Sequence, residues 1–396
     1  MRPRLLYISP KAATFVRNDL RMLSDSFEVR AQIYPWATKW KTPFLLLRQA
    51  AVFKMFLASR MLSALLGRKL AQQLGLWHPE YVIISFPGFW SVWPVFFKHL
   101  IGCRVHIILN GTDSCAFPEL GYGDLRKPHL KRIIGYSLRG ADGLMPVSKS
   151  LLYHESTYYA SSTFPSQGVR AHFPKLSTPA CVIPNGIDPD FWNIRPDFPR
   201  TPNRVITVLG PGQTFLKGVE LMVAAASNAP HLEFYIAGID ELPSHSQSPH
   251  LAENPTLAHL PSLPSNVYFL GRCTPLELRQ HYRSSQYYFQ LSYFEGFGVA
   301  LVEAMACGCI PVVSTACSLP ETSGARPEHL LQQPDLETVN KLLTDLPTST
   351  ADLDRTLNVK VSAFAHENYT FAQRKEAIEK FIVRQECRNP SVTSPS

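Results

Sequence analysis

The chain has 396 residues, a formal net charge of +8 and a hydrophobic content of 45%. This length predicts two or three domains, each able to bury its own core. The eight cysteines are scattered, and only Cys307 and Cys309 form a close pair. No C-x-x-C pair and no signal peptide are visible, which argues against a zinc site and a disulfide scaffold and favours a reduced compartment. No DNA- or RNA-binding motif is present, so we expect no nucleic-acid partner.

The chain opens with a short apolar run, Leu5–Ser9, which is typical of a buried strand. A helix is predicted next, with Phe15, Leu20 and Leu23 on one face.

The segment Val29–Pro79 contains no Asp or Glu. Within it, Phe44–Leu74 is rich in Leu, Phe, Met and Ala, and Trp36, Trp40 and Trp77 flank it as an interfacial aromatic belt would. No uninterrupted run of 18 apolar residues occurs, so we do not expect it to span a bilayer. A basic amphipathic helix at an anionic membrane surface and a core helix with a solvated basic rim both remain open. Its basic residues are Arg30, Lys39, Lys41, Arg48, Lys54, Arg60, Arg68 and Lys69.

Further buried strands are predicted at four places before the middle of the chain: Tyr81–Phe86, Val105–Leu109, Gly143–Val147 and Val182–Ile183. Between the last two, residues 153–179 are polar and punctuated by proline, which indicates a loop-rich excursion. Asn110-Gly111-Thr112-Asp113 directly follows the second of these strands. Ligands of open α/β sheets bind at the carboxyl ends of strands, so these residues are candidates for a site. A purely structural turn with an Asx-type hydrogen bond is the alternative.

The second half repeats the pattern of strands and helices after a proline-rich segment, residues 193–203. Residues 240–266 predict an exposed insertion, and residues 386–396 a disordered tail. The predicted strands are Val205–Leu209 and Val267–Leu270, and the predicted helices are Pro275–Ser284, Leu336–Leu346, Leu353–His366 and Phe371–Ile382.

One stretch, Tyr293–Ser314, carries the strongest signal. It follows a buried strand at Tyr287–Leu291, and its helix, Val299–Ala306, ends at Gly308 in a C-cap position. The strand Ile310–Ser314 comes next, so the stretch is a strand–loop–helix–strand unit of a parallel sheet.

The polar residues of this unit lie where such units bind ligands. The amides around Gly296 and Gly298 precede a helix N-terminus, which favours an anion such as a diphosphate. Glu295 lies in the loop, and Glu303 follows eight residues later within the helix. A carboxylate in an apolar helix needs a partner, and ligand hydroxyls can supply one. A local ion pair for Glu303 and a plain glycine turn remain equally open.

Residues 295–314, EGFGVALVEAMACGCIPVVS, resemble the E-x7-E signature of retaining GT-B glycosyltransferases, in particular family 4. The resemblance implies an α/β fold of two doubly wound Rossmann-like domains that face a cleft. It assigns the donor sugar and phosphate to Glu295 and the backbone of Gly296, Phe297, Gly298 and Val299. It assigns the ribose hydroxyls to Glu303.

Weaker resemblances extend this set in the second half of the chain. Residues 210–218 are similar to the family's G-R…K-G loop, in which Gly212 lies and Lys217 would neutralise the diphosphate. Pro211 stands where the family has Arg, so we consider Arg272 as a substitute cation. Arg272 and Cys273 follow the predicted strand Val267–Leu270. In the family the backbone of this segment lies near the nucleobase.

In the first half, residues 110–113 resemble the family's His-Gly-x-Asp, with Asn110 in place of His and with Gly111 and Asp113 retained. Asn cannot titrate near neutral pH. Residues 184–188, PNGID, resemble a segment that borders the cleft, which makes Asn185 a candidate. Many family members carry a glycine pair after the first strand. This chain has Ser9, Pro10, Lys11 and Ala12 there, and we assign no site to that loop.

The resemblance implies a retaining hexosyltransferase that moves sugar from a UDP- or GDP-linked donor to a saccharide or lipid-linked acceptor, in polysaccharide or glycolipid synthesis. Glu295, Lys217 and Asn110 form its expected catalytic set, with no metal and no cofactor. The expected location is cytoplasmic, with peripheral attachment to the inner face of the membrane. We expect an acceptor-side domain at 1–192, a linker at 193–203, a donor domain at 204–370, a helix returning to the first domain at 371–385 and a tail at 386–396. A non-catalytic nucleotide-sugar-binding protein and an epimerase of the same fold are the alternatives.

Overall fold

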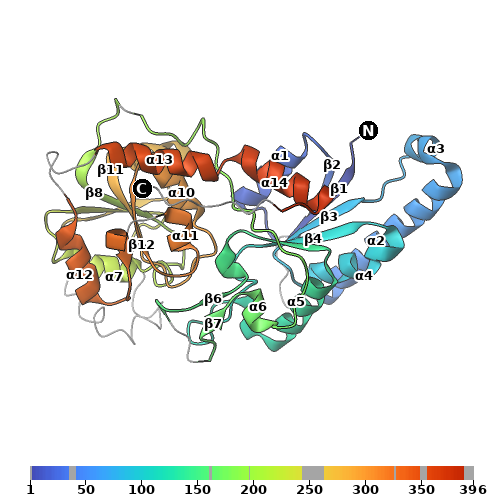
Figure 1. Ribbon diagram of the computed structural model, residues 1–396, viewed down its shortest axis with the longest axis horizontal. Helices are drawn as coiled ribbons and strands as arrows, with labels where there is room; N and C mark the ends of the chain where they lie inside the picture. Colours follow the sequence, from blue (N-terminus) through green and yellow to red (C-terminus); the bar gives the residue numbers. More distant parts are fainter. Residues whose placement is uncertain are drawn as a thin grey trace. The chain divides into compact units, whose positions relative to one another are not determined.

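The computed structural model describes residues 2–34, 42–159, 163–195, 197–242, 263–324, 327–347 and 355–387. The chain divides into two compact units. Unit 1 comprises Met1–His154, Ser166–Gly186 and Phe371–Asn389, and unit 2 is built mainly of Glu155–Pro165 and Ile187–Thr370. Each unit contains one parallel sheet with helices packed on it (Figure 1). The α/β prediction is therefore confirmed.

The sheet of unit 1 has five strands in the order β2-β1-β3-β4-β5. All its pairings are parallel, and Leu6 of β1 lies opposite Val82 of β3. The central strands are apolar along most of their length because helices cover both faces. The strands are β1 (Arg4–Ser9), β2 (Glu28–Ile33), β3 (Tyr81–Ser85), β4 (Arg104–Leu109) and β5 (Gly143–Pro146).

The helices of unit 1 include the C-terminal helix of the described chain. That helix, α14, packs beside α1 (Figure 1) and buries Arg374, Ile378 and Phe381. The described residues 153–159 and 163–179 form short elements joined by loops, among them β6 (His154–Glu155) and β7 (Ser166–Gln167). The helices are α1 (Thr14–Leu23), α2 (Thr42–Leu66), α3 (Arg68–Gln73), α4 (Val92–Ile101), α5 (Pro128–Gly140), α6 (Val169–His172) and α14 (Phe371–Arg384).

Helix α2 runs along α4 (Figure 1) and exposes large apolar side chains. Leu47, Met55 and Leu65 are 71%, 69% and 83% exposed. The segment Leu46–Leu66 is long and apolar enough to cross a membrane by length and composition, with 17% of its most apolar window buried. Single basic residues interrupt the apolar run without lowering its mean hydropathy below that of a membrane-spanning helix, so the expectation that this segment does not span a bilayer stays a prediction.

The predicted aromatic belt around α2 is wrong at Trp77. This residue is 5% exposed, and its ring packs against Phe56 under the guanidinium of Arg30. It is thus a core residue of unit 1. Its position in the sequence alone did not distinguish a buried core tryptophan from one at a membrane interface. Trp36 and Trp40 lie outside the described residues.

The sheet of unit 2 has six parallel strands in the order β10-β9-β8-β11-β12-β13. The strands are β8 (Thr201–Val208), β9 (Glu233–Ala237), β10 (Val267–Gly271), β11 (Ser285–Gln290), β12 (Ile310–Ser314) and β13 (Leu330–Leu331). The helices are α7 (Val219–Ala226), α9 (Pro275–Ser284), α10 (Val299–Ala306), α11 (Leu319–Ser323), α12 (Leu336–Asp345) and α13 (Arg355–Asn368). Helices α9 and α10 and strand β12 begin and end where the sequence predicts.

The structure differs from the sequence-based predictions at Val182–Ile183 and at two of the cysteines. Val182–Ile183 is not a strand, although Cys181 and Ile183 donate backbone hydrogen bonds to the β5 carbonyls of Leu144 and Pro146. Most of the predicted insertion, residues 243–262, and the tail from 388 lie outside the described residues.

The cysteines are not all reduced, because Cys181 and Cys387 form a disulfide with 5.5 Å between their Cα atoms. The two are 206 positions apart, so no spacing pattern could reveal the pair.

Candidate active site

The centre of the candidate site in unit 2 is a contact between Lys217 and Glu295. Strands β8 and β11 are neighbours in the sheet, so the loops that follow their carboxyl ends meet. The ammonium of Lys217 donates to Oε2 of Glu295, and the two side chains are 16% and 15% exposed. The E-x7-E loop and the K-G loop, 78 positions apart, are thus joined by their charged residues.

Gln290 is a third member of this cluster, and the sequence reasoning missed it. It ends β11, is 2% exposed, and donates from Nε2 to Oε2 of Glu295. Its Oε1 is buried and has no hydrogen-bond partner in the described structure. The signal was present, since a Gln within an apolar buried strand needs a polar partner. Gln290 and Lys217 together fix the position of the Glu295 carboxylate.

The loop after β8 and the loop after β11 pack directly against one another. Phe215 stacks on Tyr293 with 4.7 Å between ring centroids and 9° between ring planes, and Tyr293 N donates to the Leu216 carbonyl at 2.9 Å. Gly218 has φ +66°, and a Cβ there would lie 2.1 Å from the Leu291 carbonyl oxygen. Only glycine permits this approach, so the K-G loop can pack directly on the loop after β11.

Helix α10 begins directly after the glycine loop. Gly298 precedes it with φ +90°, a conformation that favours glycine, and Phe297 is buried against Tyr369 with 5.4 Å between ring centroids. The first amides of α10, from Val299 on, have no carbonyl partners within the helix, which makes its N-terminus attractive to an anion. Gly296 is buried in the same loop, whereas Gly212 has φ +71° and open space around its Cα.

Glu303 lies one turn further along α10, among apolar side chains. Burial raises the pKa of its carboxyl from 4.5 to about 8. Within the described residues no side chain or amide donates a hydrogen bond to this carboxyl group. At neutral pH the group is therefore largely protonated, and it is free to accept or donate a hydrogen bond to a ligand hydroxyl.

The two candidate residues after β10 stand apart from this cluster. Arg272 is exposed, and the described structure shows no contact of its side chain with Lys217 or Glu295. Cys273 is partly buried, its Sγ is 3.9 Å from the Leu270 carbonyl oxygen, and burial raises the pKa of its thiol. The substitution of Arg272 for the missing cation thus stays a hypothesis.

Unit 1 carries the other candidates at the carboxyl end of β4. The Asp113 carboxylate is fully buried and accepts hydrogen bonds from Gly111 N at 2.9 Å, Asn110 N at 3.1 Å and Ser114 Oγ at 3.0 Å. Burial raises the pKa of Asp113 to about 6, against the opposing effect of these donors. The turn that we considered as a structural alternative is therefore present, with Asp113 as its acceptor. The Asn110 side chain donates from Nδ2 to Ser85 Oγ at 3.1 Å.

Asn185 lies elsewhere in unit 1 and is 5% exposed, with a buried Oδ1 that has no partner in the described structure. The neighbouring Pro184 carbonyl accepts from Arg374 of α14 at 2.8 Å. The segment that resembles the family's cleft border is thus anchored to the C-terminal helix.

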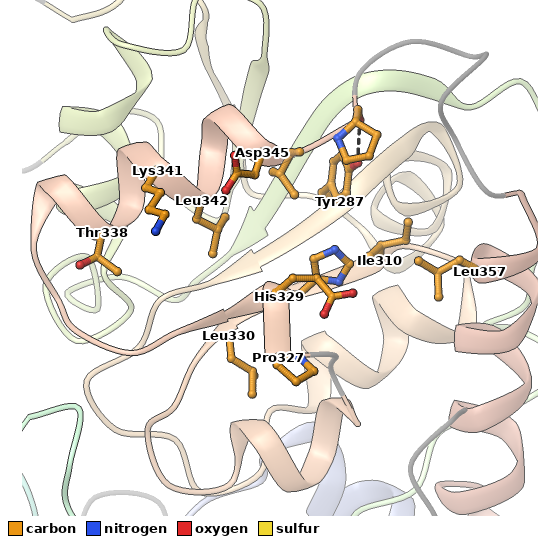
Figure 2. Close-up of a pocket in the computed structure, with 13 residues that line it drawn as sticks. Tyr287, Ile310, Pro327, His329, Leu330, Thr338, Lys341, Leu342, Asp345 and Leu357 are labelled. Atoms are coloured by element: carbon orange, nitrogen blue, oxygen red, sulfur yellow. Dashed lines mark hydrogen bonds between the residues drawn. The ribbon is translucent and has the colours of Figure 1, made fainter.

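Unit 2 also contains a cavity of about 500 Å³ (Figure 2), and its lining includes none of Lys217, Gln290 and Glu295. It lies beside α12 and is lined by Tyr287, Ile310, His329 and Lys341 among others. Ile310 begins β12. The cavity is therefore near the amino end of the strand, whereas Glu295 follows a carboxyl end.

Comparisons with known proteins bear on the same residues. Residues 191–348 match the family "Glycosyl transferases group 1". This segment contains Lys217, Gln290, Glu295 and Glu303. This part of the chain therefore matches a group 1 glycosyltransferase domain, whereas family 4 membership and the retaining mechanism stay predictions.

Two curated relatives match this chain at low sequence identity. The chain is 23% identical over 239 residues to a phosphatidylinositol N-acetylglucosaminyltransferase component of Arabidopsis thaliana, covering 58% of this chain and 47% of that protein. It is 22% identical over 301 residues to the gpi3 component of phosphatidylinositol N-acetylglucosaminyltransferase in Schizosaccharomyces pombe, covering 68% and 60%. The matches thus span less than two thirds of the length of either relative.

Solved structures establish the fold. Sucrose-phosphate synthase of Thermosynechococcus elongatus is similar with a TM-score of 0.68 and 14% identity, over 96% of this chain and 98% of that one. Anabaena HepE in complex with UDP-glucose gives 0.63 and 15%, over 96% and 99%. The fold is that of the GT-B glycosyltransferases, as predicted.

Proposed function

We propose that this protein transfers a sugar from a nucleotide diphosphate sugar to an acceptor hydroxyl, with retention of the anomeric configuration. The contact of Lys217 and Gln290 with Glu295 at the start of α10 carries the proposal. A cation, a carboxylate and a helix N-terminus then lie together at the carboxyl ends of β8 and β11. The cation and the helix N-terminus can bind a diphosphate, and the carboxylate can bind sugar hydroxyls.

Each residue then has a role in binding or in the chemical step. The ammonium of Lys217 and the first amides of α10 stabilise the charge that develops on the leaving diphosphate. Glu295, held by Gln290, accepts hydrogen bonds from sugar hydroxyls, and Glu303 binds the ribose hydroxyls. As the sugar–phosphate bond breaks, the leaving phosphate oxygen takes the proton of the acceptor hydroxyl while the new glycosidic bond forms on the same face. Asn110 contributes a hydrogen bond on the acceptor side.

A lipid-linked acceptor at the cytoplasmic face of a membrane is the acceptor class that we favour. The exposed apolar side chains of α2 are interspersed with the exposed Arg48 and Lys54, and α4 adds Phe96 at 55% exposure. Apolar insertion and attraction to anionic lipid then act together. The names of the two curated relatives also refer to a phospholipid.

Flotation with vesicles containing phosphatidylserine tests the membrane step. The wild type should float with the vesicles, and neutralising Arg48, Lys54 and Arg60 together should release most of it, by roughly tenfold or more. Lys375→Met on α14 is the control for a change of one charge outside this helix. Equal flotation of the triple variant and the control would leave α2 without a membrane role.

A non-catalytic nucleotide-sugar-binding protein is the second candidate, and Pro211 favours it. The loop that holds Lys217 lacks the second cation, so less charge is available to stabilise the leaving group. Such a protein would bind the donor without turnover.

The deciding experiment compares binding and turnover. We expect UDP-N-acetylglucosamine, another UDP-sugar or a GDP-sugar to raise the melting temperature, because a ligand of the folded state stabilises it by mass action. Glu303→Ala should abolish that shift. With acceptor lipid, Lys217→Met should lose roughly 100-fold or more in kcat, as loss of one charge-stabilising group does elsewhere, and proton NMR should show a retained anomer. Binding without product would establish the binding protein, and an inverted product would refute retention.

A further inference from the structure

A buried hydrogen-bonded network in unit 1 leads from helix α14 to the side chain of Asn110. The Arg374 guanidinium donates to both carboxylate oxygens of Asp19, and the Tyr7 hydroxyl donates to Asp19 Oδ2 at 2.9 Å. Ser85 is a further hydrogen-bond partner of the Tyr7 hydroxyl, and Asn110 Nδ2 donates to Ser85 Oγ at 3.1 Å. Tyr7 and Ser85 have no role in the reaction proposed above.

The pairing of the strands aligns these side chains on one face of the sheet. Tyr7 of β1 lies opposite Ile83 of β3, two residues before Ser85. Ser85 in turn lies opposite Ile108 of β4, two residues before Asn110. Side chains two positions apart on a strand point to the same face. Helices α1 and α14 supply the remaining two members of the network and pack against each other (Figure 1).

The members between Arg374 and Asn110 are shielded from solvent. Tyr7 and Ser85 are 0% exposed, and Asp19 is 1% exposed. A buried donor or acceptor that loses its partner has no bulk water to replace it, so each link of such a network depends on the next.

The carboxylate at one end of the network sets the direction of all its hydrogen bonds. Asp19, paired with a guanidinium, can only accept, so the Tyr7 hydroxyl donates its hydrogen there. Burial raises the pKa of Tyr7, and the hydrogen bond with Ser85 opposes that rise, as a donor to the phenol oxygen does. Ser85 has then used its single hydrogen and can accept only from an N–H of Asn110. The Ile108 carbonyl, 3.4 Å from the same Nδ2, can likewise only accept.

The Asn110 amide is therefore held in one of its two orientations. Its nitrogen points into the network, and its buried Oδ1 has no hydrogen-bond partner in the described structure. An unpaired buried oxygen needs a donor, which a substrate hydroxyl can supply. The opposite orientation would offer N–H groups to the substrate and leave the Ser85 oxygen without its donor.

We propose that Tyr7 and Ser85 are positioning residues that orient Asn110, with the Asp19–Arg374 pair as the fixed end of their network. Asn110 then offers an oxygen, and not an N–H, to a substrate hydroxyl. The inference rests on the proposed transferase function, in which Asn110 forms a hydrogen bond with substrate. It also gives α14 a part in the site, through its Arg374.

NMR tests the network without any substrate. In the ¹⁵N-labelled full chain, the side-chain amide signals of Asn110 are those that Asn110→Asp lacks. Their hydrogen exchange should be slower than that of exposed Asn side chains by roughly 100-fold. Tyr7→Phe, which does not touch Asn110, should remove at least roughly tenfold of that protection, and Ser85→Ala should remove it as well.

Tyr287→Phe is the matched control. It also removes a buried tyrosine hydroxyl, which donates to the Pro347 carbonyl at 2.7 Å, but it lies in unit 2 and should leave the protection of Asn110 unchanged. An Asn110 amide that exchanges freely in the wild type, or equally slowly in the wild type, Tyr7→Phe and Ser85→Ala, would overturn the proposal.

Kinetics then tests whether the network acts through Asn110. The probes are the nucleotide sugar with the largest thermal shift and phosphatidylinositol in detergent micelles. Tyr7→Phe should lower kcat roughly tenfold, the effect of one lost hydrogen bond, and keep the thermal shift, since the donor residues belong to unit 2. In an Asn110→Ala background, Tyr7→Phe should have no further effect on kcat.

Independent effects that multiply in the double variant would refute positioning and leave Tyr7 a purely structural residue of unit 1. A wild type with neither a donor shift nor product would instead refute the transferase function. The exchange of the Asn110 amide would then still decide whether the network orients this side chain, so the two failures are distinguishable.

Discussion

Removing one partner of the buried pair between Asp19 and Arg374 should be among the most destabilising single changes in unit 1. The Arg374 guanidinium donates to both Asp19 oxygens, at 2.7 and 2.9 Å, and to the carbonyls of Ile183 and Pro184, at 3.0 and 2.8 Å. Asp19 also accepts from the buried Tyr7 hydroxyl at 2.9 Å. The side chains of Arg374 and Asp19 are 3% and 1% exposed.

Arg374→Met should therefore destabilise unit 1 by about 3–5 kcal/mol, because it leaves the Asp19 charge buried and two carbonyls without their donor. For a unit of this size that lowers the melting temperature by about 6–20 °C. The matched control is Lys375→Met, one position along α14. Its partner Asp25 is 72% exposed at 3.0 Å, so the loss should stay below about 1 kcal/mol.

Scanning calorimetry gives the melting temperatures, and hydrogen exchange of the β1 and β3 amides assigns the transition to unit 1. An Asp19→Asn/Arg374→Met double variant should recover part of the loss, since the buried charge is then gone as well. Equal melting temperatures for Arg374→Met and Lys375→Met would refute the reasoning. They would mean that α14 is held by its apolar face alone.

Two further predictions concern unit 2. Because the folded pKa of Glu303 is raised from 4.5 to about 8, its ionisation costs stability progressively as pH rises from about 5 to 8. Glu303→Gln should therefore melt increasingly above the wild type across that interval, with a constant difference beyond it, and a difference that does not change with pH would contradict the shift. Gly218→Ala should cost more than about 2 kcal/mol in urea unfolding, because its Cβ meets the Leu291 carbonyl and φ is positive, whereas Gly212→Ala at φ +71° with free space should cost only about 1 kcal/mol. Equal losses would show that the loop shifts to admit the Cβ.

The elements that the sequence predicted well are those with chemical markers at both ends. Helix α9 has Pro275 at its first turn and a Thr274–Glu277 capping box, and α10 lies between Gly298 and Gly308. In such cases local chemistry alone determines the boundaries. The carboxyl-end positions of Glu295 and Asn110 followed from the same strand assignments.

What the sequence could not show depends on contacts between distant positions. Trp77 is buried because Phe56 covers it, and Cys181 meets Cys387 because α14 returns to unit 1. Gln290 is a partial case, since a Gln within an apolar strand indicates that a polar partner is needed. The identity of that partner, Glu295, appears only once the loop after β11 folds back, so the assembled fold is needed to assign its role.

The protonation of Glu303 bears on the absence of a cation at Pro211. Burial raises the pKa of the Tyr288 hydroxyl, and Glu295 and Glu303 both raise it further, so the two carboxyl groups lie near one region of unit 2. At neutral pH Glu303 is largely uncharged, and Glu295 is balanced by Lys217. A diphosphate that binds at the N-terminus of α10 thus meets little net negative charge even without an Arg in the loop after β8. A raised carboxyl pKa and a missing guanidinium offset one another electrostatically, which makes the substitution by Pro211 compatible with the proposed function.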